Sequence, residues 1–161
     1  MSIKVGDPLP DATFTVMTPE GPKTRTTGEI FKGRKVVLFA VPGAFTPTCS
    51  MNHLPGFLAK EAEFKAKGID EIAVVSVNDT FVMDAWAKQS GAADKILFLA
   101  DGSAAFAKAA GLTLDLTERG LGLRSQRFSM LVDDGIVKKL NVEDSIGKAE
   151  ISGADALLGQ I

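Results

Sequence analysis

The sequence is poor in the residue types that build most reactive sites. Among 161 residues there is one cysteine, one histidine, one tryptophan and no tyrosine. A single cysteine excludes an internal disulfide framework. The acidic residues are scattered and form no ligand cluster with the histidine, so we expect no metal site and no cofactor. Chemistry that uses a lone thiol remains open.

Charge and hydropathy exclude two further classes of partner. The formal net charge is −2, which provides no basic surface for nucleic acid or an anionic membrane. The longest apolar run, at 36–41, is followed by Pro42 and Gly43 and is too short to span a membrane. The first residues lack the pattern of a signal peptide, so we expect a cytoplasmic protein.

The length and the order of the expected elements predict one α/β domain over residues 1–161. Apolar runs of strand length alternate with segments of helical period, which indicates a sheet covered by helices on both faces. We expect strands at 13–17, 35–41, 71–77, 95–100, 126–132 and 136–142, and helices at 28–31, 50–67, 81–89, 104–110 and 153–158. Thr27 and Ser152 are the expected caps of the first and last helices, and 112–125 is expected to be a long loop.

Cys49 follows a turn between the strand at 35–41 and a helix. Thr46 fits the N-cap of this helix and Pro47 its first position, so Cys49 falls in the first turn. A helix N-terminus stabilises an anion, and reactive cysteines are thiolates with pKa values below the ordinary value of about 8.5. The alternative is that Cys49 is a small buried hydrophobe without chemistry.

Four residues are candidate partners of the cysteine. Thr46 lies three residues before it on the same helical turn, although it could serve only as the cap. His53, four residues after it, could approach the sulfur as a base or be an ordinary helix residue. Arg124 and Arg127 could stabilise a thiolate or could be solvated side chains.

The run from Val41 to Ser50, with Arg127 downstream, resembles the signature of the peroxiredoxins. The longer pattern is similar to the type II (Prx5) subfamily, close to its glutaredoxin-linked plant and bacterial members. Matching segments continue at 53–57, 76–79, 81–86, 120–127 and 134–137, so the resemblance spans nearly the whole chain.

The resemblance implies a thioredoxin-like fold, with a central mixed β-sheet flanked by helices and an N-terminal β-hairpin extension. It implies thiol-dependent reduction of hydrogen peroxide and alkyl hydroperoxides. Cys49 would be the peroxidatic nucleophile, Thr46 and Arg127 donors to the reacting atoms, and Pro42 a shield for the pocket. Arg124 matches a second family arginine that supports the site.

The sequence departs from some relatives by having no second, resolving cysteine. A Cys49 sulfenic acid therefore needs an outside thiol, which the resemblance implies to be glutathione with glutaredoxin. Related proteins form homodimers through a face near the active site, and we expect one here.

Other functions are weighed against the peroxidase. A thiol–disulfide oxidoreductase would ordinarily have a second cysteine where Asn52 stands. A cysteine hydrolase using His53 would need a third triad member, and none is identifiable. A non-catalytic redox-sensing or binding relative could keep the fold alone, but it would have no need of Pro42, Thr46, Cys49 and Arg127 together.

Overall fold

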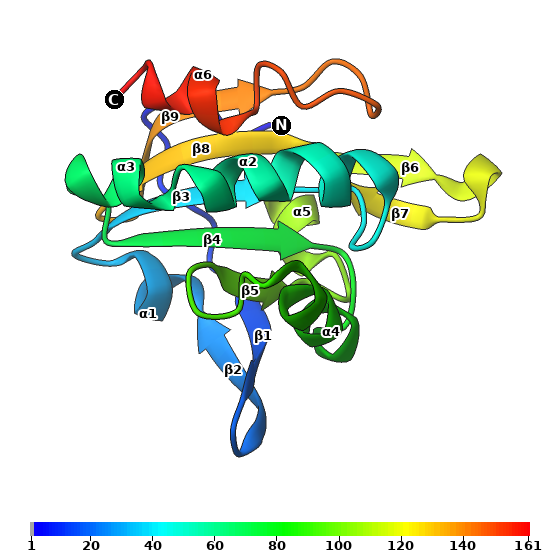
Figure 1. The fold of residues 1–161 in the computed structure, drawn as a ribbon. Helices are drawn as coiled ribbons and strands as arrows, with labels where there is room; N and C mark the ends of the chain where they lie inside the picture. Colours follow the sequence, from blue (N-terminus) through cyan, green and yellow to red (C-terminus); the bar gives the residue numbers. More distant parts are fainter. Residues whose placement is uncertain (1) are drawn as a thin grey trace.

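The computed structural model describes residues 2–161, and its centre is a seven-stranded mixed sheet (Figure 1). The strand order is β2-β1-β5-β4-β3-β8-β9. The three inner strands β5, β4 and β3 are parallel, and the strands outside them pair antiparallel. The α/β class, the central mixed sheet and the N-terminal hairpin are as predicted, and the hairpin forms one edge of this same sheet.

The described elements follow the predicted order closely. The strands of the main sheet are β1 (Thr13–Thr18), β2 (Gly21–Thr26), β3 (Lys35–Ala40), β4 (Glu71–Ser76), β5 (Leu97–Ala100), β8 (Phe128–Asp133) and β9 (Ile136–Val142). The α-helices are α1 (Thr27–Phe31), α2 (Leu54–Ala59), α3 (Glu61–Ala66), α4 (Thr80–Ser90), α5 (Ala105–Ala110) and α6 (Ala154–Leu158). None of the helices within residues 2–161 has the length and apolar character needed to cross a membrane.

The inner strands are apolar without interruption because both faces of the sheet are covered. In β3, Val37 and Phe39 face a cluster that includes residues of α2, α3, α4 and α6. Val36 and Leu38 face a second cluster that includes residues of α1 and α5. This alternation follows from the two-residue period of a strand, and it holds β3 rigidly at the centre of the molecule.

Two predicted helix caps are wrong by one residue or more. Thr26, not Thr27, caps α1, and it forms a capping box with Glu29. The Thr27 hydroxyl instead donates to the Pro10 and Ala12 carbonyls. Ser152 does not cap α6, because its hydroxyl donates to the Glu143 carboxylate at 2.7 Å. In both cases a long-range contact takes the hydroxyl that local sequence assigned to the helix.

The expected loop at 112–125 is also wrong. It contains the hairpin of β6 (Thr113–Leu116) and β7 (Gly122–Ser125), joined by a 3₁₀ turn at Thr117–Arg119. These strands are only four residues long and pair only with each other. The alternation of polar and apolar residues in β6 is too short to distinguish a strand from a loop, and β7 shows no alternation. In Figure 1 the hairpin projects from the right-hand end of the molecule.

The predicted helix at 50–67 is interrupted twice. Its first part, η1 (Cys49–His53), is a π-helix in which the Leu54 N–H donates to the Cys49 carbonyl. Pro55 follows directly, and a proline inside a helix has no N–H and crowds the preceding turn. The second break is at Lys60, whose backbone leaves helical geometry between α2 and α3. The widened turn begins at the cysteine itself, and such turns are frequent at functional sites.

The sheet brings the cysteine and the distant arginine to the same edge. Cys49 follows the carboxyl end of β3, and Arg127 immediately precedes β8. Because β8 is antiparallel to β3, its first residue, Phe128, pairs with Ala40 at the end of β3. Arg127 therefore leaves the sheet beside the turn that leads to Cys49.

Candidate active site

The turn between β3 and the helix has a constrained backbone. Phe45 has a φ of 65°, a left-handed conformation that bulky residues rarely adopt. A side chain at Gly43 would place its Cβ 3.0 Å from both Arg124 Nη1 and Thr46 Cγ2, so glycine allows this close approach. The Asn78 side chain accepts a hydrogen bond from the Ala44 N–H at 3.0 Å. Such strain persists only where the surroundings fix the chain, and it is common at active sites.

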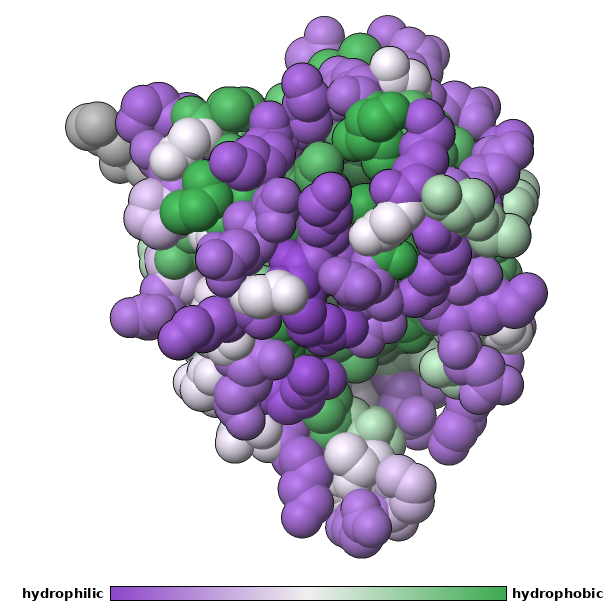
Figure 2. All heavy atoms as spheres, turned by 90° about the vertical axis from the view of Figure 1, so that its left-hand side faces the viewer, coloured by the Kyte–Doolittle hydropathy of each residue, from purple (hydrophilic) through white to green (hydrophobic). Residues whose placement is uncertain are grey.

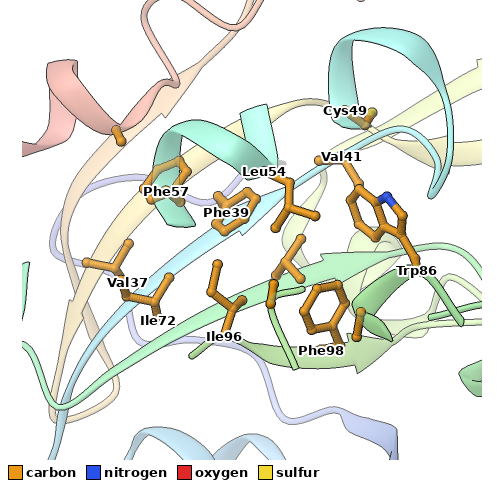
Figure 3. Close-up of a cluster of buried hydrophobic side chains, with 14 of the residues drawn as sticks. Val37, Phe39, Val41, Cys49, Leu54, Phe57, Ile72, Trp86, Ile96 and Phe98 are labelled. Atoms are coloured by element: carbon orange, nitrogen blue, oxygen red, sulfur yellow. The ribbon is translucent and has the colours of Figure 1, made fainter. Parts of the chain in front are cut away.

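The helix begins at Pro47, as the sequence predicts. Its first backbone hydrogen bond runs from the Ser50 N–H to the Thr46 carbonyl at 2.9 Å. Cys49 therefore lies in the first turn, where the N–H groups have no acceptor within the helix. The side chain sits at one end of the buried cluster, near Val41 and Trp86 (Figure 3).

Two polar groups reach the cysteine sulfur. The Thr46 hydroxyl lies 2.8 Å from Cys49 Sγ, and Arg127 Nη2 lies 3.1 Å from it. Cys49 is fully buried and Arg127 is only 3% exposed. An inert hydrophobic cysteine would have no need of a buried guanidinium, whose burial is costly unless it is paired. The structure thus brings together three of the predicted site residues.

The Thr46 hydroxyl can serve the sulfur in either protonation state. It has one proton and two acceptors nearby, Cys49 Sγ and the Gly43 carbonyl at 2.7 Å. With a thiol, the hydroxyl donates to the carbonyl and its oxygen accepts from the S–H. With a thiolate, the same proton turns to the sulfur. Its role is therefore not that of a simple helix cap.

His53 does not face the sulfur as a catalytic base. Its Nδ1 lies 3.1 Å from Arg127 Nη1, and its Nε2 lies 2.8 Å from the Ser152 carbonyl. Because a guanidinium can only donate, Nδ1 accepts and the proton is on Nε2. Burial lowers the pKa of His53 to about 3, and the Arg127 charge acts in the same direction. The ring is therefore neutral. Of the two alternatives for His53, neither a base at the sulfur nor an ordinary helix residue is found, because His53 pairs with Arg127.

Pro42 is at the start of the turn, and Arg124 contacts the backbone of the turn. Pro42 is buried directly after Val41, and its carbonyl accepts a hydrogen bond from Arg124 Nη1 at 3.3 Å. Arg124 Nε donates to the Leu121 carbonyl at 2.8 Å. Arg124 therefore supports the backbone of the turn, and the hydrogen bonds to the sulfur come from Thr46 and Arg127.

Sequence reasoning missed three residues around this site. Asn78 is the second residue after β4, the parallel neighbour of β3. The carboxyl ends of the two parallel strands lie at the same edge of the sheet, which was a usable signal. Glu143 and Ser152 carried no such signal. Glu143 directly follows β9, and a charged side chain is ordinarily solvated, yet Glu143 is only 8% exposed. Among residues 2–161, no three potential metal-binding side chains gather at one place.

The comparisons with known proteins agree with this arrangement. The Redoxin family model matches residues 4–158. The chain is 49% identical to peroxiredoxin-2E, chloroplastic, of Arabidopsis thaliana, over 97% of this chain and 68% of that one. It is 52% identical to peroxiredoxin-2E-2, chloroplastic, of Oryza sativa subsp. japonica, over 98% of this chain and 72% of that one. The chain belongs to the peroxiredoxin family.

A solved structure supports the same assignment. Reduced Prx3 from Vibrio vulnificus in complex with H₂O₂ is 51% identical and superposes with a TM-score of 0.93 over 98% of each chain. The fold is thioredoxin-like, as the resemblance implied. This peroxiredoxin is a thiol-dependent peroxidase of the type II group, which takes peroxides as substrates and thiols as reductants.

The buried neutral histidine predicts a specific loss of stability in acid. The pKa of His53 falls from 6.5 to about 3 on folding. The unfolded chain therefore binds the proton more strongly, so this stability is complete above pH 6.5 and declines as the pH falls toward 3. Between pH 7 and pH 5 the expected loss is about 2 kcal/mol.

Urea unfolding at pH 7, 6 and 5 tests this prediction at a fixed protein concentration. His53 is the only histidine, and a Cys49→Ser background removes titration of the thiol. In that background, adding His53→Asn should remove most of the decline. Equal declines with and without His53→Asn would show that the histidine does not cause it.

Proposed function

We propose that Cys49 is the peroxidatic nucleophile of this peroxidase, with Thr46 and Arg127 as donors to the reacting atoms. The observation that carries the proposal is the geometry at the sulfur, with Arg127 Nη2 at 3.1 Å and Thr46 Oγ1 at 2.8 Å. Fixed donors of this kind act on charge as it develops and need no rearrangement during the reaction.

The reaction is an in-line displacement at one peroxide oxygen. The Cys49 thiolate attacks that oxygen, an S–O bond forms and the O–O bond breaks. The departing oxygen takes the electron pair and a proton and leaves as water or alcohol, and Cys49 becomes a sulfenic acid. Negative charge moves from sulfur to the departing oxygen, so donors that reach both ends of this path lower the barrier. Arg127 and the N–H of Cys49, which lies in the first helical turn, are suited to this task.

Pro42 has a protective role in this proposal. It is buried directly after the central strand, and Arg124 holds its carbonyl. In this proposal its rigid apolar ring limits the access of water to the turn that carries the cysteine, and a drier site strengthens the donor contacts to the sulfur.

Two substitutions test the assignment of the nucleophile and the donor. Cys49→Ser should abolish peroxide reduction, because a hydroxyl is not ionised near neutral pH. Arg127→Ala should slow sulfenic acid formation about 100-fold or more, since each lost charge-assisted hydrogen bond is worth about 1.5–3 kcal/mol.

The measurement is stopped-flow fluorescence of Trp86 with stoichiometric peroxide. Trp86 is the only tryptophan, and its Nε1 donates to Ser50 Oγ at 3.0 Å, next to Cys49. Arg119→Ala, which alters an exposed arginine, is the matched control and should react like the unmodified protein. An unchanged rate in Arg127→Ala would remove that residue from the site.

We propose glutathione with glutaredoxin as the reducing system. The chain has one cysteine, so its sulfenic acid has no internal thiol to condense with. Two Cys49 residues fully buried in separate copies are poorly placed to meet, because a disulfide requires Cα atoms within about 7 Å. A small thiol displaces water from the sulfenic acid and gives a mixed disulfide. A glutaredoxin thiolate then attacks the glutathione sulfur and releases the Cys49 thiolate.

Peroxidase turnover measured separately with each reducing system tests this choice. Continuous peroxide consumption is expected with glutathione, glutaredoxin and glutathione reductase. Little is expected with thioredoxin and thioredoxin reductase. Equal turnover with both systems would refute the preference for glutaredoxin, while sulfenic acid formation in the first turnover would be unaffected.

We propose that two copies associate through the face around the Cys49 turn. The turn residue Phe45 is 44% exposed, and Met51 of η1 is 80% exposed. Phe81, near the start of α4, is 65% exposed. Trp86 of α4 contacts the Cys49 turn, because its ring centroid lies 6.5 Å from that of Phe45. Figure 2 shows the opposite end of the molecule, where hydrophobic residues are scattered among hydrophilic ones.

Light scattering after size exclusion tests the dimer. The unmodified protein should elute with twice the mass of one chain, and Phe81→Asp should shift it toward the monomer because the association would bury a charge. Val5→Asp is the control, since Val5 is 56% exposed and lies in the N-terminal segment, outside the proposed interface. A monomeric unmodified protein would contradict the proposal.

A further inference from the structure

Both terminal nitrogens of the Arg127 guanidinium donate hydrogen bonds. Its Nη2 donates to Cys49 Sγ at 3.1 Å and to the Ile146 carbonyl at 3.2 Å. Its Nη1 donates to His53 Nδ1 at 3.1 Å. A guanidinium is planar, so fixing one terminal nitrogen limits where the other can point. The His53 contact therefore restrains the nitrogen that meets the sulfur.

His53 can accept from Arg127 only in one tautomer. The Ser152 carbonyl, 2.8 Å from Nε2, holds the proton on that nitrogen and leaves the Nδ1 lone pair free. Ring contacts with Phe39 and Phe57, at centroid distances of 5.0 and 5.5 Å, limit the orientation of the imidazole. The acceptor for Arg127 is thus set by a backbone group 99 residues away in the chain.

Ser152 is in turn held by a buried carboxylate. Glu143 Oε2 accepts from the Ser152 N–H at 3.0 Å and from its hydroxyl at 2.7 Å. Burial alone would raise the pKa of Glu143, but the hydrogen bonds from Ser152 and its neighbours lower it overall, so the carboxylate is ionised. Gly153 allows the tight turn formed with residues 149–152, because a Cβ there would lie 2.8 Å from the Ala149 carbonyl oxygen.

We propose that His53, fixed by the Ser152 carbonyl and the Glu143 carboxylate, is a positioning residue that sets the orientation of Arg127 at the cysteine sulfur. The inference rests on the proposed roles of Cys49 and Arg127. It assigns His53 no contact with the peroxide and no proton transfer.

Two substitutions of His53 separate its two hydrogen bonds. In His53→Asn the side-chain oxygen stands near the position of Nδ1 and can still accept from Arg127, but the bond to Ser152 is lost. In His53→Gln the amide nitrogen reaches the position of Nε2 and keeps the Ser152 bond, whereas no acceptor remains at the Nδ1 position. Both remove the imidazole and retain a polar amide, so they are matched in chemistry.

The measured quantity is the second-order rate constant for sulfenic acid formation from reduced protein and H₂O₂. His53→Gln should be slowed about 10- to 100-fold, the equivalent of one hydrogen bond to a charged group. His53→Asn should react at least about fivefold faster than His53→Gln. The same two substitutions made together with Arg127→Ala should give equal rates, because the group they orient is absent.

The combined variants distinguish a positioning role from a structural one. A gap between the Asn and Gln variants that persists with Arg127→Ala would overturn the proposal, as would equal rates in the presence of Arg127. A normal rate for Arg127→Ala itself would instead refute the proposed site. Circular dichroism and thermal unfolding establish that each variant folds.

Glu143→Ala provides a second test that leaves the histidine in place. It leaves the buried N–H and hydroxyl of Ser152 without their acceptor and so loosens the support of His53. Sulfenic acid formation should slow about three- to tenfold, and this effect too should vanish with Arg127→Ala. An unchanged rate in folded Glu143→Ala would contradict the proposal that the Glu143 carboxylate helps to fix His53 through Ser152.

Discussion

The contact between Arg127 and the Cys49 sulfur is the interaction on which the rest of the site depends. A guanidinium that is only 3% exposed must be paired to be tolerated. The ion pairs within residues 2–161 do not include Arg127, and its other acceptors, His53 and the Ile146 carbonyl, are neutral. Among the hydrogen-bond partners of the Arg127 guanidinium, the sulfur is the one that can carry a negative charge. The arrangement therefore couples a buried cation to a reactive anion.

The topology of the sheet makes this contact possible over a large separation in sequence. Cys49 and Arg127 are 78 residues apart, yet each lies just outside the same edge of the central sheet. The antiparallel pairing of β8 with β3 places Phe128 opposite Ala40. Both strands are buried on their two faces, so neither can shift its register without exposing apolar side chains. The relative positions of Cys49 and Arg127 are therefore fixed by the packing of the sheet.

The sequence predicted the parts of the site that depend on local chain geometry. Thr46 and Pro47 mark a helix start wherever they occur in this order after a turn, so the place of Cys49 in the first turn followed directly. The π-helical widening was missed because the analysis of hydrophobic periodicity assumes regular helices. Pro55 nevertheless indicated that the helix is irregular at this point, because a proline interrupts helical hydrogen bonding. The hairpin at 113–125 was missed because its strands are only four residues long, so the alternation in β6 is brief and β7 has none.

Contacts between segments that are distant in the chain could not be predicted from the sequence. Spacing suggested that His53 would face Cys49, since both lie on one helix. In the structure its ring nitrogens meet Arg127 and the Ser152 carbonyl, which are 74 and 99 residues further along the chain. Helical periodicity carries no information about such partners. The burial of Glu143 could not be predicted either, because it depends on how the segment after β9 folds back toward the helix of Cys49.

The same groups that organise the site also determine how the fold responds to acid. A proton added to His53 would remove the acceptor of Arg127 and place two cations side by side, which is why its pKa is low. Protonation of Glu143 would weaken its bonds to Ser152, so its lowered pKa acts in the same direction. Asp101 acts oppositely, because burial raises its pKa and its protonated form is favoured in the folded state. Asp101 caps α5 through the N–H groups of Phe106 and Ala107 and lies outside the network of Arg127. His53 and Glu143 are therefore acid-sensitive groups that also belong to the hydrogen-bonded network orienting the guanidinium.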